Sequence, residues 1–312
     1  MELLFLEPIF KERIWGGSRL KTDYGYHIPS NTTGESWVIS AHNHGETCIR
    51  NGKLAGMKLS EVWNTYPELF ANTVKRQFPL MVKIIDASHN LSVQVHPDDQ
   101  FAQMMENDSG KHECWYILNA SADSRIVYGH NAKNSQELKT MVNNQEWNKL
   151  LRAVAVKKGD FFPVPTGTIH AIGADTLILE VQQSSDVTYR IYDYDRRDDN
   201  GNLRELHQDK ALAVIKSPHY DKRGQFERLR VNADSSFVVF DSNEYFKVGK
   251  LVVNGDLPEL KLSVPYLLVS VVDGAGTING YTVKKGDNFI VPNQIRRLKI
   301  SGYLTLITTS EN

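Results

Sequence analysis

Four residues in the segment from Gly159 to His170 have types and a spacing that suit metal chemistry. Gly159, Pro165, Gly167 and His170 stand in the pattern G-x5-P-x-G-x2-H. We expect a strand to begin after the first glycine, a tight turn to use the proline and the second glycine, and the histidine to open the next strand. We infer that the segment holds one imidazole inside a small β-barrel, where an imidazole usually serves as a metal ligand.

Candidate partners for this imidazole lie upstream. Gln94 and His96 are two residues apart in an expected strand, so their side chains share one face. Glu113 opens the next apolar strand, while Cys114 should point to the opposite face. With His170, these residues would supply one amide oxygen, two imidazole nitrogens and one carboxylate oxygen. Such a set suits zinc, and also iron(II), manganese or cobalt, with Gln94 as the weakest member because an amide is a poor ligand.

Each upstream residue also has an ordinary structural interpretation. A Gln-x-His pair arises by chance in many chains, and a lone glutamate before an apolar strand is more often a solvated edge charge. The pattern that ends at His170 is more specific, and the three segments together favour a metal site. The other histidines lack comparable geometry and are expected to be surface or packing residues, among them His42, His44, His89, His112, His130, His207 and His219.

The elements that must position these residues are mostly strands. Short runs rich in Val, Ile, Phe and Tyr alternate with Gly, Pro and Asn, and strands are expected over 91–95, 114–118 and 176–182. Helical patterns are fewer. They predict a helix near Leu59 with Ser60 as N-cap, a helix over 98–105 capped by Asp98, and a helix over 135–151 capped by Ser135. We expect a mainly β fold with helices inserted around a barrel.

An internal repeat divides the chain. The run VKKGDFFPVP from Val156 recurs as VKKGDNFIVP from Val283, which indicates a duplicated β unit. The second copy has Gln294 and Arg297 at the positions of Gly167 and His170, so it should keep the turn and lose the ligand. The polar segment 217–224 is the best linker candidate. We therefore expect a metal-binding domain over 1–218 and a degenerate, metal-free domain over 219–312.

Composition excludes several classes of protein. The net charge of −1 gives no reason to expect nucleic acid or an anionic membrane as partner, and 41% hydrophobic residues fit a globular protein. The N-terminal run lacks the basic region of a signal peptide, and no apolar run reaches the length of a membrane span. Cys48 and Cys114 are too few for a disulfide framework. A cytoplasmic location is the default expectation.

These motifs resemble those of a known family. The Gly159 to His170 segment resembles the second cupin motif, and Gln94-x-His96 followed by Glu113 resembles a modified first cupin motif. The modification is similar to that of type I mannose-6-phosphate isomerases in their short bacterial form. The supporting stretches cover the chain from near residue 5 to about 215, and they are IWGG (14–17), GESW (34–37), VHPDD (95–99), GTIHAI (167–172) and QQSSDVTYR (182–190).

The resemblance implies two cupin-type jelly-roll domains, the first with inserted helices, and interconversion of mannose 6-phosphate and fructose 6-phosphate. It implies one Zn²⁺ per chain, with other divalent metals as alternatives, held by Gln94, His96, Glu113 and His170. The family's catalytic arginine corresponds to Arg190 and a substrate-site lysine to Lys111. A hexose 6-phosphate is then the expected small-molecule partner, and a monomer is favoured, although the oligomeric state is left open.

The residue types suit an isomerase that works through a cis-enediol. Lys111 could bind an anionic sugar oxygen or carry a proton, and the fork of Arg190 suits a phosphate or an enediolate oxygen. Each has an alternative: a solvated loop lysine, and an ion pair with Asp186, Asp193 or Asp195.

The general base is left open between two glutamates. Glu35 lies in an apolar stretch beside Trp37 that could raise its pKa, and the direction of the Glu180 side chain is not determined by the sequence. Asp186 lies in a matching stretch and is counted with them as substrate-binding. Trp15 either shapes the mouth of the pocket or packs in the core.

Two other functions compete with the isomerase. An iron-dependent cupin oxygenase would more commonly have two histidines in the first motif and no use for an arginine and lysine pair. A non-catalytic sugar-phosphate sensor would not need to keep the metal set.

Overall fold

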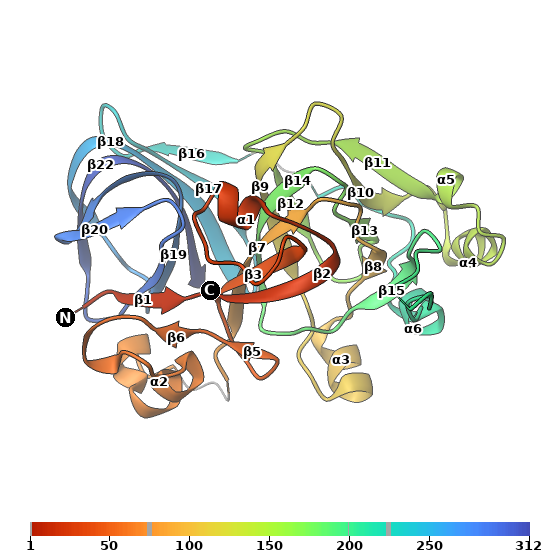
Figure 1. Ribbon diagram of the computed structural model, residues 1–312, viewed down its shortest axis with the longest axis horizontal. Helices are drawn as coiled ribbons and strands as arrows, with labels where there is room; N and C mark the ends of the chain where they lie inside the picture. Colours follow the sequence, from red (N-terminus) through yellow and green to blue (C-terminus); the bar gives the residue numbers. More distant parts are fainter. Residues whose placement is uncertain (1, 74–76, 199, 223–225) are drawn as a thin grey trace.

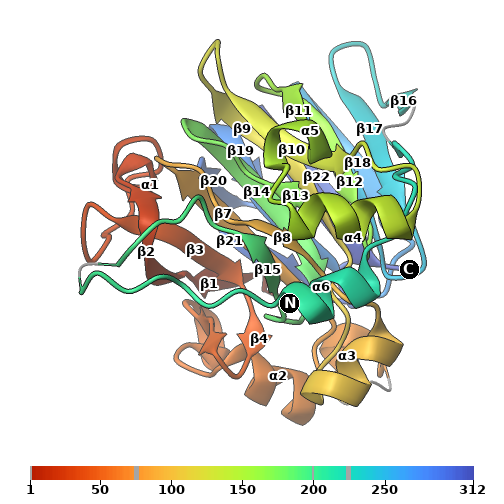
Figure 2. The ribbon, with the colours of Figure 1, turned by 90° about the vertical axis from the view of Figure 1, so that its right-hand side faces the viewer.

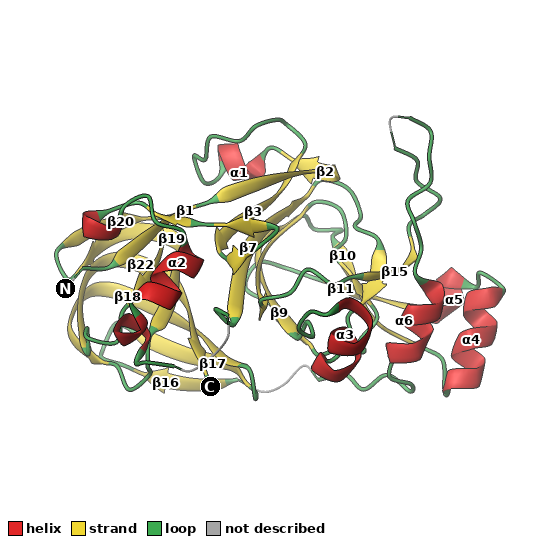
Figure 3. Ribbon diagram, turned by 90° about the horizontal axis from the view of Figure 1, so that it is seen from below, coloured by secondary structure: helices red, strands yellow, loops and turns green. Residues whose placement is uncertain are grey.

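The computed structural model describes residues 2–73, 77–198, 200–222 and 226–312. Strands make up most of the regular structure, and Figure 1 shows them in two halves that lie side by side, with the C-terminal strands on the left. Figure 3 shows the helices around the outside of these strands. The prediction of a mainly β fold with inserted helices is confirmed.

The first half contains two sheets that face each other across an apolar core. The six-stranded sheet has the order β12 (Phe161–Val164), β9 (Glu113–Ala120), β14 (Thr176–Gln183), β7 (Leu80–Ala87), β3 (Thr33–Ile39) and β2 (Ile9–Gly17). The five-stranded sheet has the order β11 (Leu151–Ala155), β10 (Arg125–His130), β13 (His170–Ala171), β8 (Val93–Val95) and β15 (Tyr189–Tyr192). Buried side chains from both sheets, such as Trp115 and Tyr128, form one cluster between them.

Three helices cover the outer face of the five-stranded sheet: α4 (Ser135–Asn143), α5 (Trp147–Leu150) and α6 (Gln208–Val214). Figure 2 shows α4 and α6 in front of β8 and β15. Val93 and Val95 pack among the apolar side chains of these helices. Because successive side chains of a strand point to opposite faces, this packing directs Ser92, Gln94 and His96 into the space between the two sheets.

The predicted helix after Asp98 is confirmed. Helix α3 spans Asp99–Glu106, and the Asp98 carboxylate accepts a hydrogen bond from the backbone N–H of Phe101 over 3.0 Å. Short helical turns elsewhere are α1 (Arg19–Thr22), η1 (Gly52–Leu54) and η2 (Pro67–Phe70).

The predicted cap at Ser60 is wrong. Helix α2 spans Leu59–Thr65, and its N-cap is Lys58, whose backbone N–H donates to Glu61 Oε2 over 3.0 Å. The hydroxyl of Ser60 donates instead to the carboxylate of Glu46.

The predicted helix over 135–151 is two helices, and its cap is also one residue earlier. Asn134 caps α4 by accepting from the backbone N–H of Glu137 over 2.9 Å, so Ser135 is the first helical residue. Gln145 then adopts a left-handed conformation with φ of 55°, which separates α4 from α5.

The C-terminal half is a nine-stranded sheet that also contains two strands from the N-terminal region. Its order is β16 (Glu227–Arg230), β17 (Ser236–Ser242), β18 (Phe246–Lys261), β22 (Arg297–Glu311), β19 (Leu267–Ile278), β21 (Asn288–Val291), β1 (Leu4–Glu7) and β6 (Cys48–Ile49), with β20 (Tyr281–Lys284) paired to β19. Strands β4 (Ala41–His42) and β5 (Gly45–Glu46) form a separate ribbon.

The boundary between residues 218 and 219 stays a prediction, and part of the linker candidate, 223–224, lies outside the described residues.

The repeat of the sequence is a repeat of structure. Gly159 and Gly286 have φ of 94° and 96°. In each copy an aspartate accepts from the backbone N–H three residues earlier, Lys157 to Asp160 and Lys284 to Asp287, both over 2.9 Å. Arg297, at the position equivalent to His170, is 67% exposed and pairs with Glu259, so the second copy keeps the turn without the ligand.

Candidate metal centre and substrate pocket

Three of the predicted ligands meet between the two sheets of the first half. His96 follows β8, His170 opens β13, and Glu113 opens β9 in the opposite sheet. The Nε2 atoms of the histidines are 3.1 Å apart, and oxygens of Glu113 lie 3.4 Å from His96 Nε2 and 3.5 Å from His170 Nε2. All three side chains are buried, and one atom from each could bind the same metal ion.

The outer contacts of the imidazoles prepare them to act as ligands. His96 Nδ1 lies 2.8 Å from the carbonyl of Val187, and His170 Nδ1 lies 2.9 Å from the carbonyl of Thr168. Since a carbonyl only accepts, each Nδ1 carries the proton and each Nε2 presents a lone pair. Burial, with the nearby Lys111 ammonium, lowers the pKa of His96 well below its usual value, and burial lowers the pKa of His170 to about 4. Two imidazole lone pairs and a carboxylate that meet at one point are donors that divalent metal ions prefer, so the residues present fit a metal ion.

The fourth predicted ligand, Gln94, precedes His96 by two residues and lies opposite His170 in β13. It is half-buried and lines the adjoining cavity. Its role as a ligand stays a prediction. The prediction for Cys114 is confirmed, because its side chain is buried in the apolar cluster on the other face of β9.

The turn that delivers His170 requires glycine at 167. Gly167 has φ of 83°, and its N–H donates to the carbonyl of His96 over 2.9 Å. A Cβ added there would lie 2.8 Å from the carbonyl oxygen of Val214. Gly159 has φ of 94°, but a Cβ there would meet nothing within 4 Å. Both close packing and backbone conformation therefore require glycine at 167, whereas only the backbone conformation favours glycine at 159.

We expect Gly167→Ala to lower the free energy of unfolding by about 3 kcal/mol and Gly159→Ala by about 1 kcal/mol, because only the first adds a clash to the left-handed strain. Urea denaturation of the metal-free protein measures both values. Equal losses would contradict the close approach of Gly167 to Val214.

Lys111 lies beside the predicted ligands. Its Nζ is 2.9 Å from Glu113 Oε2 and 3.3 Å from His96 Nε2, and at 5% exposure it is not a solvated loop lysine. Burial alone would lower the pKa of Lys111, but Glu113 and Glu180 raise it above its usual value, so the group is an ammonium near neutral pH. Lys83, in the middle of β7, is a second buried lysine 3.6 Å from Glu180 Oε1. It was not predicted, although a lysine inside an apolar strand is a usable signal.

Glu35 does not have the surroundings expected of a general base. Its Oε1 accepts from Arg13 Nε and its Oε2 accepts from Trp37 Nε1, both over 2.7 Å. Burial would raise the pKa of Glu35, but Lys83, Arg13 and Trp37 together bring it below the usual value. The prediction of a raised pKa is wrong because these partners outweigh the burial.

Glu180 points inward and keeps one carboxylate oxygen free. Its Oε2 accepts from Trp115 Nε1 over 3.0 Å, while Oε1 has no hydrogen-bond partner among the described residues. The nearest cations to Oε1 are Lys83 at 3.6 Å and Lys111 at 3.9 Å. Burial and the neighbouring Glu113 carboxylate raise the pKa of Glu180. A buried carboxylate of this kind can take up and release a proton.

Lys111, Glu35 and Glu180 all line one cavity of about 300 Å³. Its walls include every predicted catalytic and substrate-binding residue, together with one predicted ligand: Trp15, Glu35, Gln94, Lys111, Glu180, Asp186 and Arg190. Trp15 is both a core residue and part of the wall. The lining also contains residues that were not predicted, chiefly Arg13, Lys83, Ser92, Thr188 and Arg204.

Arg190 does not form the ion pair considered as its alternative role. Its Nε donates to Ser92 Oγ over 3.2 Å and its Nη1 donates to the carbonyl of Glu205 over 2.7 Å. Asp193 pairs instead with Arg196 and Arg204. The Arg190 guanidinium is therefore held in place without being neutralised by a carboxylate within 4 Å in the described part of the chain.

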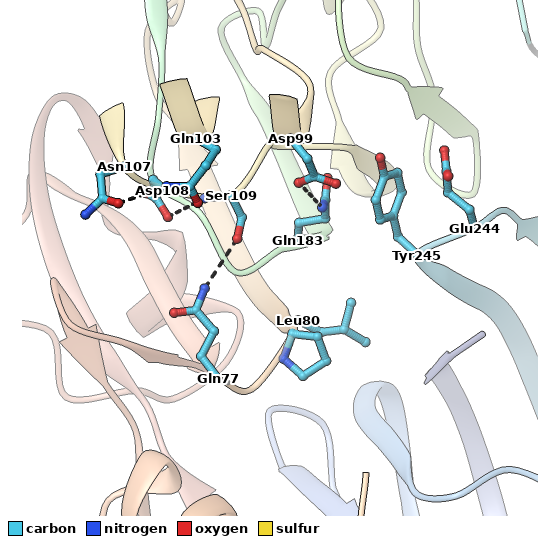
Figure 4. Close-up of a pocket in the computed structure, with 11 residues that line it drawn as sticks. Gln77, Leu80, Asp99, Gln103, Asn107, Asp108, Ser109, Gln183, Glu244 and Tyr245 are labelled. Carbon is cyan, nitrogen blue, oxygen red and sulfur yellow. Dashed lines mark hydrogen bonds between the residues drawn. The ribbon is translucent and has the colours of Figure 1, made fainter. Parts of the chain in front are cut away.

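A larger cavity, of about 490 Å³, lies elsewhere and contains none of the predicted site residues. Figure 4 shows its polar lining, in which Gln183 donates to Asp99 over 3.0 Å and Gln77 donates to Ser109 over 3.3 Å. Gln183 also accepts from the backbone N–H of His112, between Lys111 and Glu113. This cavity thus borders the segment that carries Lys111 and lacks the metal-binding set.

A mainly β protein whose facing sheets bring two histidines and a glutamate together beside a charged cavity has the architecture of a two-sheet β protein with a candidate metal centre. Among the described residues, no helix is long and apolar enough to cross a membrane.

Comparisons with known proteins specify the family. The family model "Phosphomannose isomerase type I, catalytic domain" matches residues 3–112, and "Mannose-6-phosphate isomerase, cupin domain" matches residues 236–311. Mannose-6-phosphate isomerase ManA of Bacillus subtilis strain 168 is 47% identical over 99% of this chain and 98% of that protein. The mannose-6-phosphate isomerase of Streptococcus mutans serotype c is 42% identical over 100% and 99%. The crystal structure of the Bacillus subtilis mannose 6-phosphate isomerase superposes with a TM-score of 0.94 at 41% identity, over 99% of both chains.

The chain therefore belongs to the type I phosphomannose isomerase family, and its two β-rich halves have the cupin fold of that family.

Proposed function

We propose that this protein interconverts mannose 6-phosphate and fructose 6-phosphate. The observation that carries the proposal is that one cavity adjoins the His96, Glu113 and His170 cluster and contains Lys111, Glu180 and Arg190 in its walls. Full-length relatives at 42% and 47% identity have this activity in their names. The isomerisation needs charge stabilisation on two sugar oxygens, a base over C1 and C2, and an anchor for the phosphate, and the cavity offers a group for each.

The metal in this proposal is one Zn²⁺ per chain, held by His96, Glu113, His170 and Gln94. Imidazole nitrogens with carboxylate and amide oxygens suit zinc, and the absence of sulfur leaves other divalent metals as competitors. When bound, the ion would supply Lewis-acid stabilisation of the charge that develops on the sugar oxygens.

The chain's own groups then carry the proton and the remaining charge. In the proposed reaction, the free oxygen of Glu180 removes the proton from C2 of the aldose and returns it to C1, while the proton of the O2 hydroxyl passes to O1; the reverse reaction uses the same group. The Lys111 ammonium stabilises the negative charge on the adjacent sugar oxygen, as a preorganised cation in a buried site can. Arg190 holds the anionic end of the substrate.

The test is a coupled assay for fructose 6-phosphate formed from mannose 6-phosphate. We expect activity in the purified protein, its loss after chelation, and its return when Zn²⁺ is added. Metal analysis should give about one ion per chain in the active protein. Comparison of Zn²⁺ with Fe²⁺, Mn²⁺ and Co²⁺ in the add-back step would decide which metal supports turnover best.

Protein that holds about one metal ion per chain and shows no isomerisation in any state would contradict the proposal. Binding of mannose 6-phosphate without turnover would then indicate a sensor, and oxygen consumption with bound iron would indicate an oxygenase.

We also propose a cytoplasmic location, which the two free cysteines, Cys48 and Cys114, support because reduced thiols are usual there.

A further inference from the structure

Three arginines from separate segments line the same cavity: Arg13 from β2, Arg190 from β15 and Arg204 from the connection to α6. We propose that Arg13 and Arg204 join Arg190 in binding the phosphate of the substrate, so that three guanidinium groups select phosphorylated over unphosphorylated hexoses. The inference rests on the proposed function and names the residues that set its specificity.

The residues that flank β8 place the candidate metal cluster and the Arg190 guanidinium at different ends of the site. His96, at one end, belongs to the candidate metal cluster, and Ser92, at the other, accepts from Arg190 Nε over 3.2 Å. Four residues of extended chain span roughly 13 Å. An extended hexose 6-phosphate carries its reacting carbons, C1 and C2, and its phosphate at opposite ends of the molecule. The site likewise has the candidate metal cluster at one end and the Arg190 guanidinium at the other.

Arg204 lies next to Arg190 because the segment that carries it runs beside β15. Arg190 Nη1 donates to the carbonyl of Glu205, the residue after Arg204, over 2.7 Å. The backbone N–H of His207 donates to the carbonyl of Arg190 over 2.7 Å. Burial, followed by the Arg190 guanidinium, lowers the pKa of Arg204, and Arg13 contributes in the same direction. Arg204 therefore lies close enough to both Arg190 and Arg13 for their positive charges to act on it.

The positive charge at this end exceeds the negative charge near it. Arg13 pairs with Glu35 over 2.7 Å. Arg204 shares Asp193 with Arg196 at 3.4 Å and 2.5 Å. Without Arg196, which does not line the cavity, two carboxylates face three guanidinium groups, and this leaves an excess of about one positive charge among the described residues. A phosphate carries up to two negative charges near neutral pH and accepts hydrogen bonds on three oxygens, so this excess attracts it and more than one guanidinium group can bond to it.

Glycine at position 34 makes room for one side of this site. A Cβ on Gly34 would lie 2.7 Å from Arg13 Cβ and 2.6 Å from a ring carbon of Trp15. Both of those side chains line the cavity. The Gly34-Glu35 pair therefore combines space for Arg13 with a carboxylate that orients its guanidinium.

The experiment compares Arg204→Met and Arg13→Met with Arg196→Met in the metal-loaded enzyme. Arg196 is the matched control, because it pairs with the same Asp193 but does not line the cavity. We expect Arg204→Met and Arg13→Met to raise KM for mannose 6-phosphate and Ki for inorganic phosphate by roughly 10- to 100-fold, with a smaller change in kcat. Arg196→Met should keep both constants near wild-type values. Thermal unfolding checks that each variant is folded.

Calorimetric titration of wild type and variants with inorganic phosphate separates this inference from the proposed function. Phosphate binding that Arg204→Met weakens, in a wild-type protein without isomerase activity, would sink the proposed function and keep the arginine site. An active enzyme whose phosphate Ki is unchanged by both cavity variants, or changed as much by Arg196→Met, would overturn the arginine site. An Arg13→Lys variant that restores charge but not affinity would further support bidentate recognition.

Discussion

His170→Ala is expected to remove the bound metal and to reduce turnover by roughly a thousandfold. Loss of one imidazole leaves His96 and Glu113 as the buried donors of the cluster. Lewis-acid stabilisation is worth several kcal/mol, and about 4 kcal/mol corresponds to a factor of roughly a thousand in rate. Metal analysis after dialysis and the coupled isomerase assay measure the two effects separately.

The stability of the protein gives a second readout for the same variant. A metal ion that binds only the folded state raises the unfolding temperature. Chelation should therefore lower Tm in the wild type and leave it unchanged in His170→Ala. His130→Ala is the matched control, because His130 is 3% exposed and contacts the carbonyl of Lys216, away from the cluster. Full metal content in His170→Ala would contradict the proposed centre.

Glu180→Gln is expected to lower kcat by roughly 10²- to 10⁴-fold while the metal and the fold are retained, because general base catalysis contributes about this much. The amide oxygen can still accept the hydrogen bond from Trp115, and the substitution removes the charge beside Lys83 and Lys111. Steady-state kinetics at saturating mannose 6-phosphate, with metal analysis of the same sample, measures the effect.

Glu35→Gln is the control for this prediction. Both oxygens of Glu35 already accept hydrogen bonds, from Arg13 and Trp37, so its carboxylate is an orienting group. We expect its replacement to act mainly through KM and stability. A kcat loss larger than that of Glu180→Gln would show that the base has been assigned to the wrong glutamate.

The meeting of His96, Glu113 and His170 could be predicted from the sequence because strand periodicity and turn chemistry are local. Gln94 and His96 share a face through the two-residue repeat of a strand, and Gly167 supplies a conformation that other residues adopt with strain. Cys114 was placed correctly for the same reason. Helix starts were less reliable: Ser60 and Ser135 both lie one or two residues past the true caps, where Lys58 and Asn134 compete for the same role.

Groups that depend on tertiary contacts could not be predicted. Arg13 and Arg204 meet in one cavity because β2 and the segment after β15 approach each other, and no local pattern relates those segments. The pKa of Glu35 was predicted in the wrong direction because its apolar neighbours are visible in the sequence and its partner Lys83 is not. The role of Asp193 as a shared partner of Arg196 and Arg204 likewise follows from the folded loop.

Strand β1 has a consequence for how the chain folds as it is made. It pairs with β21, Leu4 opposite Ile290, so a strand that leaves the ribosome early must wait for a partner from the far end of the chain. Until then, one edge of the β1 and β6 ribbon has unpaired backbone groups that can pair with another chain. The two halves also share one apolar core, in which Val38 and Leu179 belong to the same cluster as Phe246 and Ile307, so this core is complete only when synthesis is nearly finished. We therefore expect a nascent chain to have this strand edge unpaired until residues 288–291 have been made.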